Sequence, residues 1–218
     1  LSIRKDGDSW VLNGRKWFIT GASYDRCKIL IVMGKSDPEN SSRHLQQSQV
    51  LVPKDTPGVN IIRPLTTLGY DDAPLGHAEI VFDEVRVPLA NVLAGEGRGF
   101  EIAQTRLAPG RMHHCMRLIG AGQQALENAC HRVTDRQTFG RPLSKHQSIR
   151  ENMSKCFSEE DVARLLVQNT CWTIDNQGVM DSIPMIAVTK PTVPLVVQTW
   201  IYRRMQSTGP WGYTDTWS

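Results

Sequence analysis

Trp10-Val11-Leu12-Asn13-Gly14-Arg15-Lys16-Trp17-Phe18-Ile19-Thr20 is the stretch that decides the fold at the beginning of this chain. Aromatic and β-branched residues on both sides of an Asn-Gly pair are typical of two strands joined by a type I′ turn. We therefore predict a β-hairpin over residues 9–20, with its turn at Asn13-Gly14. The polar segment before it, Arg4 to Asp8, predicts another turn.

Four more strand-like runs follow this stretch. Clusters of Ser, Asn, Asp, Pro and Gly, which are typical of turns, separate them. The runs are Ile29–Met33, Gln49–Val52, Val59–Arg63 and Ala78–Val87. The first 92 residues are therefore expected to be all β.

The pattern changes after Asn91. Apolar residues recur at near-heptad spacing at Ile119, Leu126 and Val133, which predicts one helix from Gly99 to about Asp135. Residues 138–142 interrupt it, because a glycine and a proline follow one another closely there. The fold class is therefore predicted as α+β: a small β-domain followed by an antiparallel helical bundle.

Two further helices complete the predicted bundle. One runs from about Leu143 to Asp175, and its apolar face is expected to consist of Ile149, Met153, Phe157, Val162 and Leu166. The other runs from about Met185 to Met205. It contains Pro191 and Pro194, so we expect a kink in its first half or a late start.

Composition excludes several classes of protein. The 218 residues are 40% hydrophobic and 22% charged, which indicates a soluble globular chain rather than a disordered, collagenous or membrane-spanning one. The net charge of +3 includes no Lys/Arg tract, so nothing in it points to nucleic acid. Five cysteines without a CxxC pair favour free thiols and an intracellular protein. The chain begins without methionine and we interpret it as a fragment.

Several motifs indicate less chemistry than they first suggest. Gly95-Glu96-Gly97-Arg98-Gly99 lacks the Lys-Ser/Thr of a phosphate loop and is interpreted as a junction between sheet and helix. His113-His114-Cys115 places neighbouring residues on different helix faces, which disfavours a metal site. Asp71-Asp72 is expected to be a solvated turn. No GxSxG or HExxH sequence points to a hydrolase.

Two features leave functional alternatives open. Arg136-Gln137-Thr138-Phe139-Gly140-Arg141 places two arginines at a break between helices, where a guanidinium could bind a diphosphate or simply complement the helix C-terminus. Trp17-Phe18-Ile19-Thr20 combines aromatic rings with a hydroxyl and could line a flat heterocycle or pack into the core.

Taken in order, segments along nearly the whole chain resemble the acyl-CoA dehydrogenase family, and most closely its members ten and eleven. Further segments carry the resemblance besides residues 10–20 and 136–142: Ser36-Asp37-Pro38, Pro57-Gly58-Val59, Leu68-Gly69-Tyr70, Phe82-Asp83-Glu84-Val85-Arg86-Val87-Pro88, Glu96-Gly97-Arg98-Gly99-Phe100 and Gly110-Arg111-Met112-His113-His114-Cys115-Met116-Arg117. The resemblance implies a middle β-barrel-like domain over residues 1–93 and an incomplete C-terminal four-helix bundle over residues 94–218. The family's N-terminal helical domain is not expected in this chain.

The resemblance also implies a set of FAD contacts. Phe18 and Thr20 would lie against the isoalloxazine ring, with Thr20 near its N5 edge. Trp17 would alternate to the other face of the strand in a structural role. Diphosphate and adenosine contacts across a subunit interface are expected from Arg136, Thr138 and Gln147.

Other positions match the family less completely. Arg111 matches an arginine near the acyl-CoA. Gln206 and Gly209 match a Gln-x-x-Gly-Gly turn against adenosine, although Pro210 replaces its second glycine. Most family members carry the catalytic carboxylate beyond the point that corresponds to the end of this chain, and the alternative position is Gly110. We therefore expect no catalytic base here.

The implied activity is α,β-dehydrogenation of a fatty acyl-CoA to the trans-2-enoyl-CoA in β-oxidation, with electrons passed to an electron-transfer flavoprotein. Alternatives are an acyl-CoA oxidase or flavin monooxygenase of the same fold, or a non-catalytic interaction module. A homodimer or homotetramer is expected, located in the mitochondrial matrix or peroxisome of a eukaryote or the cytoplasm of a bacterium.

Overall fold

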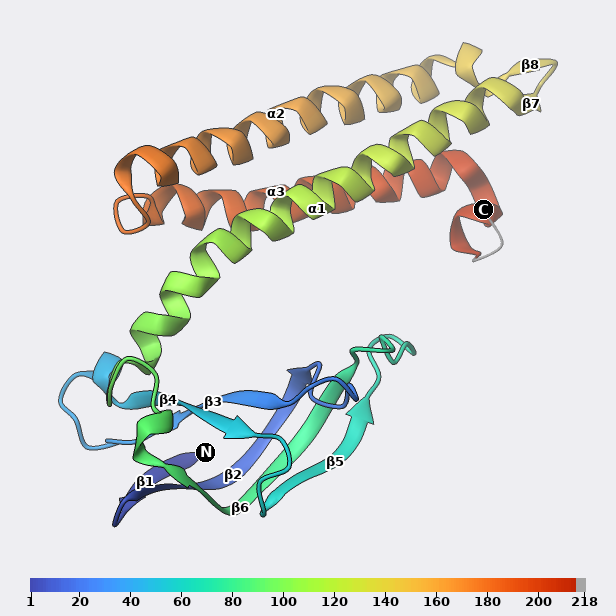
Figure 1. Cartoon of the computed structure of the whole chain (residues 1–218). Helices are drawn as coiled ribbons and strands as arrows, with labels where there is room; N and C mark the ends of the chain where they lie inside the picture. Colours follow the sequence, from blue (N-terminus) through green and yellow to red (C-terminus); the bar gives the residue numbers. More distant parts are fainter. Residues whose placement is uncertain (215–218) are drawn as a thin grey trace. The chain divides into compact units, whose positions relative to one another are not determined.

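The computed structural model describes residues 1–214 of the chain. It contains two compact units, Leu1–Gln104 and Thr105–Ser218, and the division between them falls within the first long helix. Figure 1 shows a sheet in the first unit and three long helices in the chain as a whole. The α+β class is therefore confirmed. The domain boundary expected after residue 93 stays a prediction.

The first unit is a six-stranded sheet with the order β4-β3-β1-β2-β6-β5. All its ladders are antiparallel except the single pairing of β1 with β3. Within the described residues no ladder joins β4 to β5, so the barrel-like domain is an open sheet. The strands are β1 (Ser2–Asp6), β2 (Ser9–Thr20), β3 (Ile29–Lys35), β4 (Gln47–Pro53), β5 (Val59–Leu65) and β6 (His77–Pro88), with short 3-10 turns η1 (Arg43–Leu45) and η2 (Leu89–Asn91).

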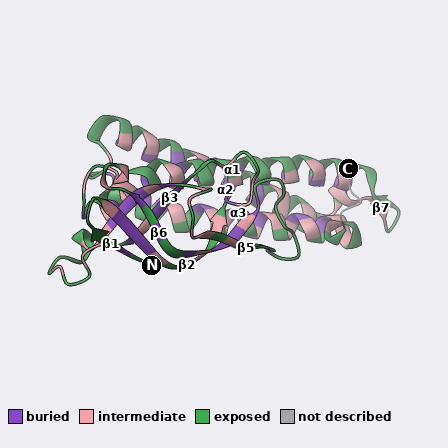
Figure 2. Cartoon of the chain, turned by 60° about the horizontal axis from the view of Figure 1, so that its bottom comes forward, coloured by how far each residue is buried: buried purple, intermediate pink, exposed green. Residues whose placement is uncertain are grey.

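One face of this sheet carries the core of the first unit. The strand residues of this apolar core come from alternate positions, as the two-residue period of a strand requires, and buried residues appear purple in Figure 2. The largest fully buried side chains in this core include Trp10, Leu12, Val50 and Ile80. This burial provides the main driving force for folding of the first unit.

The predicted hairpin at Asn13-Gly14 is wrong, because β2 runs unbroken from Ser9 to Thr20. The actual two-residue connection is Gly7-Asp8, between strands that pair Asp6 with Ser9. Arg4 therefore lies in β1 and not in a turn. Gly14 is needed for a different reason: its φ is 133°, and a Cβ there would lie 2.9 Å from the Cα of Leu1.

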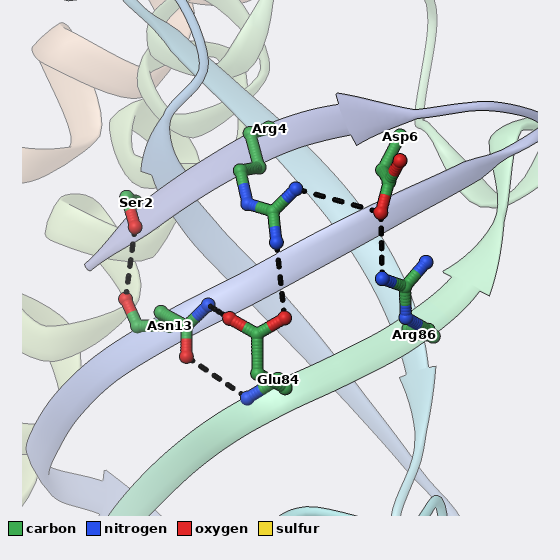
Figure 3. Close-up of polar contacts among 6 residues, drawn as sticks. All are labelled: Ser2, Arg4, Asp6, Asn13, Glu84 and Arg86. Carbon is green, nitrogen blue, oxygen red and sulfur yellow. Dashed lines mark hydrogen bonds and ion pairs between the residues drawn. The ribbon is translucent and has the colours of Figure 1, made fainter.

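Asn13 lies opposite a β-bulge in β6 instead. Asp83 and Glu84 face this single residue, and Glu84 has a φ of 48°. The Asn13 Oδ1 atom accepts a 2.9 Å hydrogen bond from the Glu84 N–H, and its Nδ2 atom donates to Glu84 Oε1 at 2.6 Å. Figure 3 shows these bonds beside the ion pairs of Glu84 with Arg4 and of Asp6 with Arg86.

The second unit contains the antiparallel helices of an incomplete bundle, except for the first residues of α1, which belong to the first unit. They are α1 (Gly99–Asp135), α2 (Gln147–Gln177) and α3 (Ile183–Thr208), with a two-stranded hairpin of β7 (Gln137–Thr138) and β8 (Arg141–Pro142) and the short helices η3 (Leu143–Lys145) and η4 (Gly209–Tyr213). The predicted bounds of α1 are confirmed. Buried and exposed positions alternate along the helices, as amphipathic packing requires (Figure 2).

Two details of these helices differ from expectation. Phe157 and Val162 on α2 are 61% and 66% exposed, and the buried positions are Cys156, Ala163 and Val167 instead. The predicted face was drawn through the largest apolar side chains, whereas the core accepts small residues one position away. The late start of the third helix is also wrong, since α3 begins at Ile183 and continues through both prolines.

Within the described residues, none of the helices has both the length and the apolar character that crossing a membrane would require.

Candidate functional site

A β-bulge in β2 creates the candidate site in the first unit. Between the pairs Lys16 with Ile80 and Ile19 with Ala78, the two residues Trp17 and Phe18 oppose one residue of β6. Phe18 adopts a φ of 54°, in the left-handed region that residues other than glycine rarely occupy. The bulge interrupts strict alternation, so a side chain in it can leave the core face.

Both bulge side chains are exposed. Trp17 is 64% and Phe18 46% exposed, and their rings meet edge to face with centroids 4.9 Å apart. The expectation that Trp17 alternates to the other face in a structural role is therefore wrong. The bulge instead presents two adjoining aromatic rings outside the core, which is a suitable surface for a planar ligand.

The hydroxyl of Thr20 belongs to a hydrogen-bonded chain at the same end of β2. Its Oγ1 atom lies 3.0 Å from Nδ1 of His77, the first residue of β6 and its direct cross-strand partner. The other ring nitrogen of His77 lies 3.0 Å from Asp72 Oδ2. The His77 ring is 5.9 Å from the Phe18 ring, so the predicted pair Phe18 and Thr20 is connected through His77, which the sequence pattern does not single out.

A paired carboxylate lies directly opposite the bulge. Glu79 is buried and forms ion pairs with Arg15 and Arg63, whose side chains are exposed. The hydrogen bond from Arg63 holds the pKa of Glu79 below its ordinary value, with a further contribution from Arg15. Glu79 is thus an ionised anchor for the three strands β2, β5 and β6, and not a free base.

The glycine-rich segment after the sheet packs against β4. The N–H of Gly97 donates to Ser48 Oγ at 2.9 Å, and a Cβ on Gly99 would lie 2.8 Å from the Gln47 carbonyl oxygen. Arg98 binds both carboxylate oxygens of Glu101, at 2.8 and 2.6 Å. These groups are engaged within the unit, in agreement with the junction interpretation.

The second unit brings together three of the predicted contact residues, around the β7–β8 hairpin (Figure 1). Arg136 follows the last residue of α1, is exposed, and forms no side-chain hydrogen bond or ion pair with another residue in the range 1–214. Thr138 lies in β7, with its Oγ1 atom 3.5 Å from His146 Nε2. Gln147 begins α2 and is exposed. Arg136 therefore presents a guanidinium that can bind an oxyanion bidentately.

The C-terminal end of α3 lies near this group. Gln206 donates to the hydroxyl of Tyr213 at 3.0 Å, and Gly209 ends the helix with a φ of 70°. The Trp211 ring lies 5.0 Å from the guanidinium of Arg132, which is one helical turn before Arg136. The predicted residues Gln206 and Gly209 therefore belong to the same end of the bundle as the hairpin.

Arg111 lies elsewhere on α1. It is half-buried and is 25 positions before Arg136, which is about 38 Å along a helix with a rise of 1.5 Å per residue. The neighbouring Gly110 carries no side chain that could act as a base. The structure therefore does not place Arg111 with the diphosphate candidates.

The His113-His114-Cys115 segment does not converge on one point. Cys115 is buried in the bundle core, whereas both histidines are exposed and His114 contacts Arg117 at 2.8 Å. Desolvation and nearby cations, Arg117 first among them, lower the pKa of His114. Within residues 1–214 all five cysteines are free thiols, and no cluster of three His, Cys, Asp or Glu side chains could hold a metal ion.

Family models match nearly all of this chain. Residues 1–85 match the middle domain of acyl-CoA dehydrogenases, and residues 97–218 match their C-terminal domain. The second unit thus corresponds to the C-terminal domain model and the sheet to the middle domain model.

Individual relatives give the same assignment. The chain is 48% identical over 197 residues to acyl-CoA dehydrogenase family member 11 of Gallus gallus, covering 90% of this chain and 25% of that protein. It is 44% identical over 214 residues to family member 10 of Mus musculus, covering 98% of this chain and 20% of that protein. The chain thus spans about a quarter or less of the length of these two relatives.

Solved structures agree with the sequence matches. A structure from Mycobacterium abscessus described as an acyl-CoA dehydrogenase has a TM-score of 0.94 and 42% identity, over 99% of this chain and 53% of that one. Butyryl-CoA dehydrogenase from Megasphaera elsdenii has a TM-score of 0.86 and 27% identity, over 100% of this chain and 55% of that one. Family models, sequence relatives and fold therefore coincide, and this chain belongs to the acyl-CoA dehydrogenase family.

Proposed function

We propose that this chain forms the flavin-contacting part of an FAD-dependent enzyme that converts a fatty acyl-CoA to its trans-2-enoyl-CoA. Membership of the acyl-CoA dehydrogenase family supports an oxidoreductase at the level of reaction class. The resemblance to butyryl-CoA dehydrogenase supports a CoA thioester as substrate. The single observation that carries the proposal is the exposed pair of bulge rings beside the Thr20 hydroxyl.

The residues present fit a flavin adenine dinucleotide in two separate respects. The Phe18 ring and the Thr20 hydroxyl offer a flat apolar surface next to a polar group, which suits an isoalloxazine ring with hydrogen-bonding edges. Arg136 offers a cation without a partner in the described part of the chain, which suits a diphosphate. We assign Thr138, Gln147, Gln206 and Gly209 to the same diphosphate and adenosine end.

When bound, FAD would accept the hydride equivalent from the acyl β-carbon as the α-proton leaves. The chain's own residues would position the cofactor and shield it from water. The Phe18 and Trp17 rings would exclude water from one face of the isoalloxazine ring, and Arg136 would bind the diphosphate. We assign Arg111 to the acyl-CoA on the family resemblance. We assign no proton acceptor within this chain, since Gly110 has no carboxylate.

We further propose that the protein works as a homodimer or homotetramer and passes electrons to an electron-transfer flavoprotein. A structure of an electron transferring flavoprotein of Acidaminococcus fermentans is among the similar ones, at 28% identity and a TM-score of 0.85. Exposed apolar side chains on α2, including Leu165 at 63% and Trp172 at 58%, support burial against further protein. The location is proposed to be a mitochondrial matrix or peroxisome in a eukaryote, or bacterial cytoplasm.

The test is the visible spectrum of the purified chain with and without FAD, followed through gel filtration. We expect flavin bands that co-elute with the protein, and a Kd raised by about tenfold or more in Arg136→Ala, since a charge-assisted hydrogen bond contributes about 1.5–3 kcal/mol. Arg43→Ala is the matched control, because Arg43 is an exposed arginine on a 3-10 turn of the sheet unit. It should bind FAD as the unmodified chain does.

The remaining outcomes separate the alternatives. Flavin bands that bleach with acyl-CoA without oxygen and return only slowly in air support a dehydrogenase, whereas rapid return in air supports an oxidase or monooxygenase. A colourless chain that FAD cannot reconstitute refutes flavin binding by this chain and leaves a non-catalytic interaction module. Equal loss of FAD in Arg136→Ala and Arg43→Ala refutes the assignment of Arg136.

A further inference from the structure

Asp72, His77 and Thr20 form one continuous hydrogen-bonded chain, and the ring of its central member His77 lies 5.9 Å from the Phe18 ring. Each of the two contacts spans 3.0 Å, and they use the two different nitrogens of the imidazole. Thr20 and His77 are direct partners across β2 and β6, so the sheet itself sets their spacing. The side chain of His77 is only 24% exposed, whereas that of Asp72 is 56% exposed.

Backbone hydrogen bonds fix the position of Asp72. Its carbonyl oxygen accepts from the N–H of Gly76 at 2.9 Å, and the Gly76 carbonyl oxygen accepts from Gly21 at 3.0 Å. The loop between β5 and β6 is thereby tied to the end of β2. Asp71 takes no part in the chain, because its Oδ1 atom accepts instead from the N–H of Ala73 at 3.1 Å.

The order of the contacts determines the direction of each hydrogen bond. An ionised carboxylate can only accept, so the nitrogen facing Asp72 must carry a proton. In a neutral imidazole the other nitrogen, Nδ1, then has a lone pair. The Thr20 hydroxyl therefore donates to His77, and its oxygen has only lone pairs left for a ligand.

We propose that His77, oriented by Asp72, is a positioning residue that makes the Thr20 hydroxyl an acceptor toward the bound ligand. The inference rests on the proposed function, in which Thr20 faces the flavin N5 edge. A flavin carries an N–H at N5 only when it is reduced, and the oxidised ring has a lone pair there. The site thus favours the reduced flavin, and it does so through a residue that does not touch the reacting atoms.

The first experiment needs no flavin. NMR of the isotopically labelled chain at about pH 8, where an ordinary imidazole is neutral, reports the protonated nitrogen of His77 and the χ1 rotamer of Thr20. We expect a proton on Nε2 and one dominant Thr20 rotamer, both unchanged in Asp71→Asn. In Asp72→Asn and His77→Phe we expect rotamer averaging at Thr20. A proton on Nδ1 in the unmodified chain, or an unchanged rotamer in His77→Phe, overturns the proposal.

The second experiment measures the Kd of oxidised FAD and of dithionite-reduced FAD without oxygen. The ratio is the Kd of oxidised FAD divided by the Kd of reduced FAD. It should fall about fivefold in Thr20→Val, which corresponds to the loss of one hydrogen bond to the reduced flavin. His77→Phe should lower the ratio too, since a freed hydroxyl can also donate to the oxidised ring. Thr20→Ser should restore it. A ratio that rises in Thr20→Val overturns the assigned direction.

The two experiments fail separately. If FAD binds in neither oxidation state, the proposed function fails for this chain, and the NMR result alone decides whether His77 orients Thr20. If FAD binds but the ratio is the same in Thr20→Val and the unmodified chain, the flavin proposal stands and the role of His77 is refuted.

Discussion

Phe18→Gly should leave the sheet unit more stable than Phe18→Ala. Both substitutions remove the ring, so the comparison isolates the backbone at φ 54°. An L-residue in the left-handed region costs about 1–2 kcal/mol relative to glycine. Glycine in a strand is about 0.5–1 kcal/mol less favourable than alanine on entropic grounds. The difference predicts that Phe18→Gly is more stable by about 0.5–1 kcal/mol, the reverse of the usual order.

Trp17 provides the matched control, because it is the adjoining bulge residue and does not have a positive φ. There, Trp17→Ala should be more stable than Trp17→Gly by about 0.5–1 kcal/mol. Amide hydrogen exchange of peptides from β2 and β6 measures the stability of the sheet unit separately from that of the helices. If Phe18→Gly exchanges faster than Phe18→Ala, the bulge conformation described here is not the one adopted in solution.

Three further outcomes are expected. Asn13→Ala should destabilise β6 by about 0.5–1.5 kcal/mol, because it removes the acceptor of the exposed bulge N–H of Glu84; hydrogen exchange across β6 that matches the unmodified chain would contradict this. The pKa of Glu79 is held below its usual 4.5, so the contribution of Glu79 to stability is complete above pH 4.5 and is lost as the pH falls through the lowered pKa. Acid unfolding of Glu79→Gln should therefore depend less steeply on pH than that of the unmodified chain. Equal steepness in the two proteins would contradict this. Burial raises the pKa of the Cys115 and Cys156 thiols, so iodoacetamide should modify exposed Cys130 first, as peptide mass mapping would show; early labelling of Cys115 would contradict the bundle core.

The long helices could be predicted from the sequence because their signal is local. Apolar residues spaced for one face of a helix determine α1 from Gly99 to Asp135 without reference to any other segment. The face of α2 was harder to predict, since Cys156 and Ala163 are buried whereas the larger Phe157 is exposed. Size and hydrophobicity do not reveal which side of a helix meets its neighbours when both sides carry apolar residues.

The hairpin prediction failed for a non-local reason. An Asn-Gly pair satisfies the backbone requirements of a tight turn, but the same pair can serve a continuous strand when a distant segment supplies the partner. Here that partner is Glu84, 71 positions away from Asn13. Short-range chemistry could not distinguish the two outcomes, because the stabilising hydrogen bonds exist only once β6 lies beside β2.

The sequence predicts two residues of the candidate site, but not the hydrogen bonds that link them to the rest of the sheet. The local combination of a ring and a hydroxyl identified Phe18 and Thr20. His77 carries no local signal, since it is 57 positions from Thr20 and becomes its neighbour only through sheet register. Asp72 was expected in a solvated turn, and it is exposed as expected, yet its carboxylate orients an imidazole.

Positive φ values in this chain occur both in segments assigned to the flavin and in segments with a purely structural explanation. Among the described residues, positive φ values outside glycine occur at Phe18, Asp72 and Phe139, and at three other positions. Each such residue costs about 1–3 kcal/mol, which a glycine would avoid. At Glu84 in the β6 bulge, the side-chain hydrogen bond with Asn13 offsets this cost. At Asp72, the contact with His77 offsets it. Phe139 is 96% exposed, and its ring meets that of His146 edge to face at 6.3 Å. With Gly140, whose φ is 74°, it forms the two-residue turn between the paired residues Thr138 and Arg141, and a type I′ turn requires a positive φ at both central residues. The positive φ of Phe139 is therefore accounted for by the tight turn between β7 and β8, and not by a contact of its exposed ring.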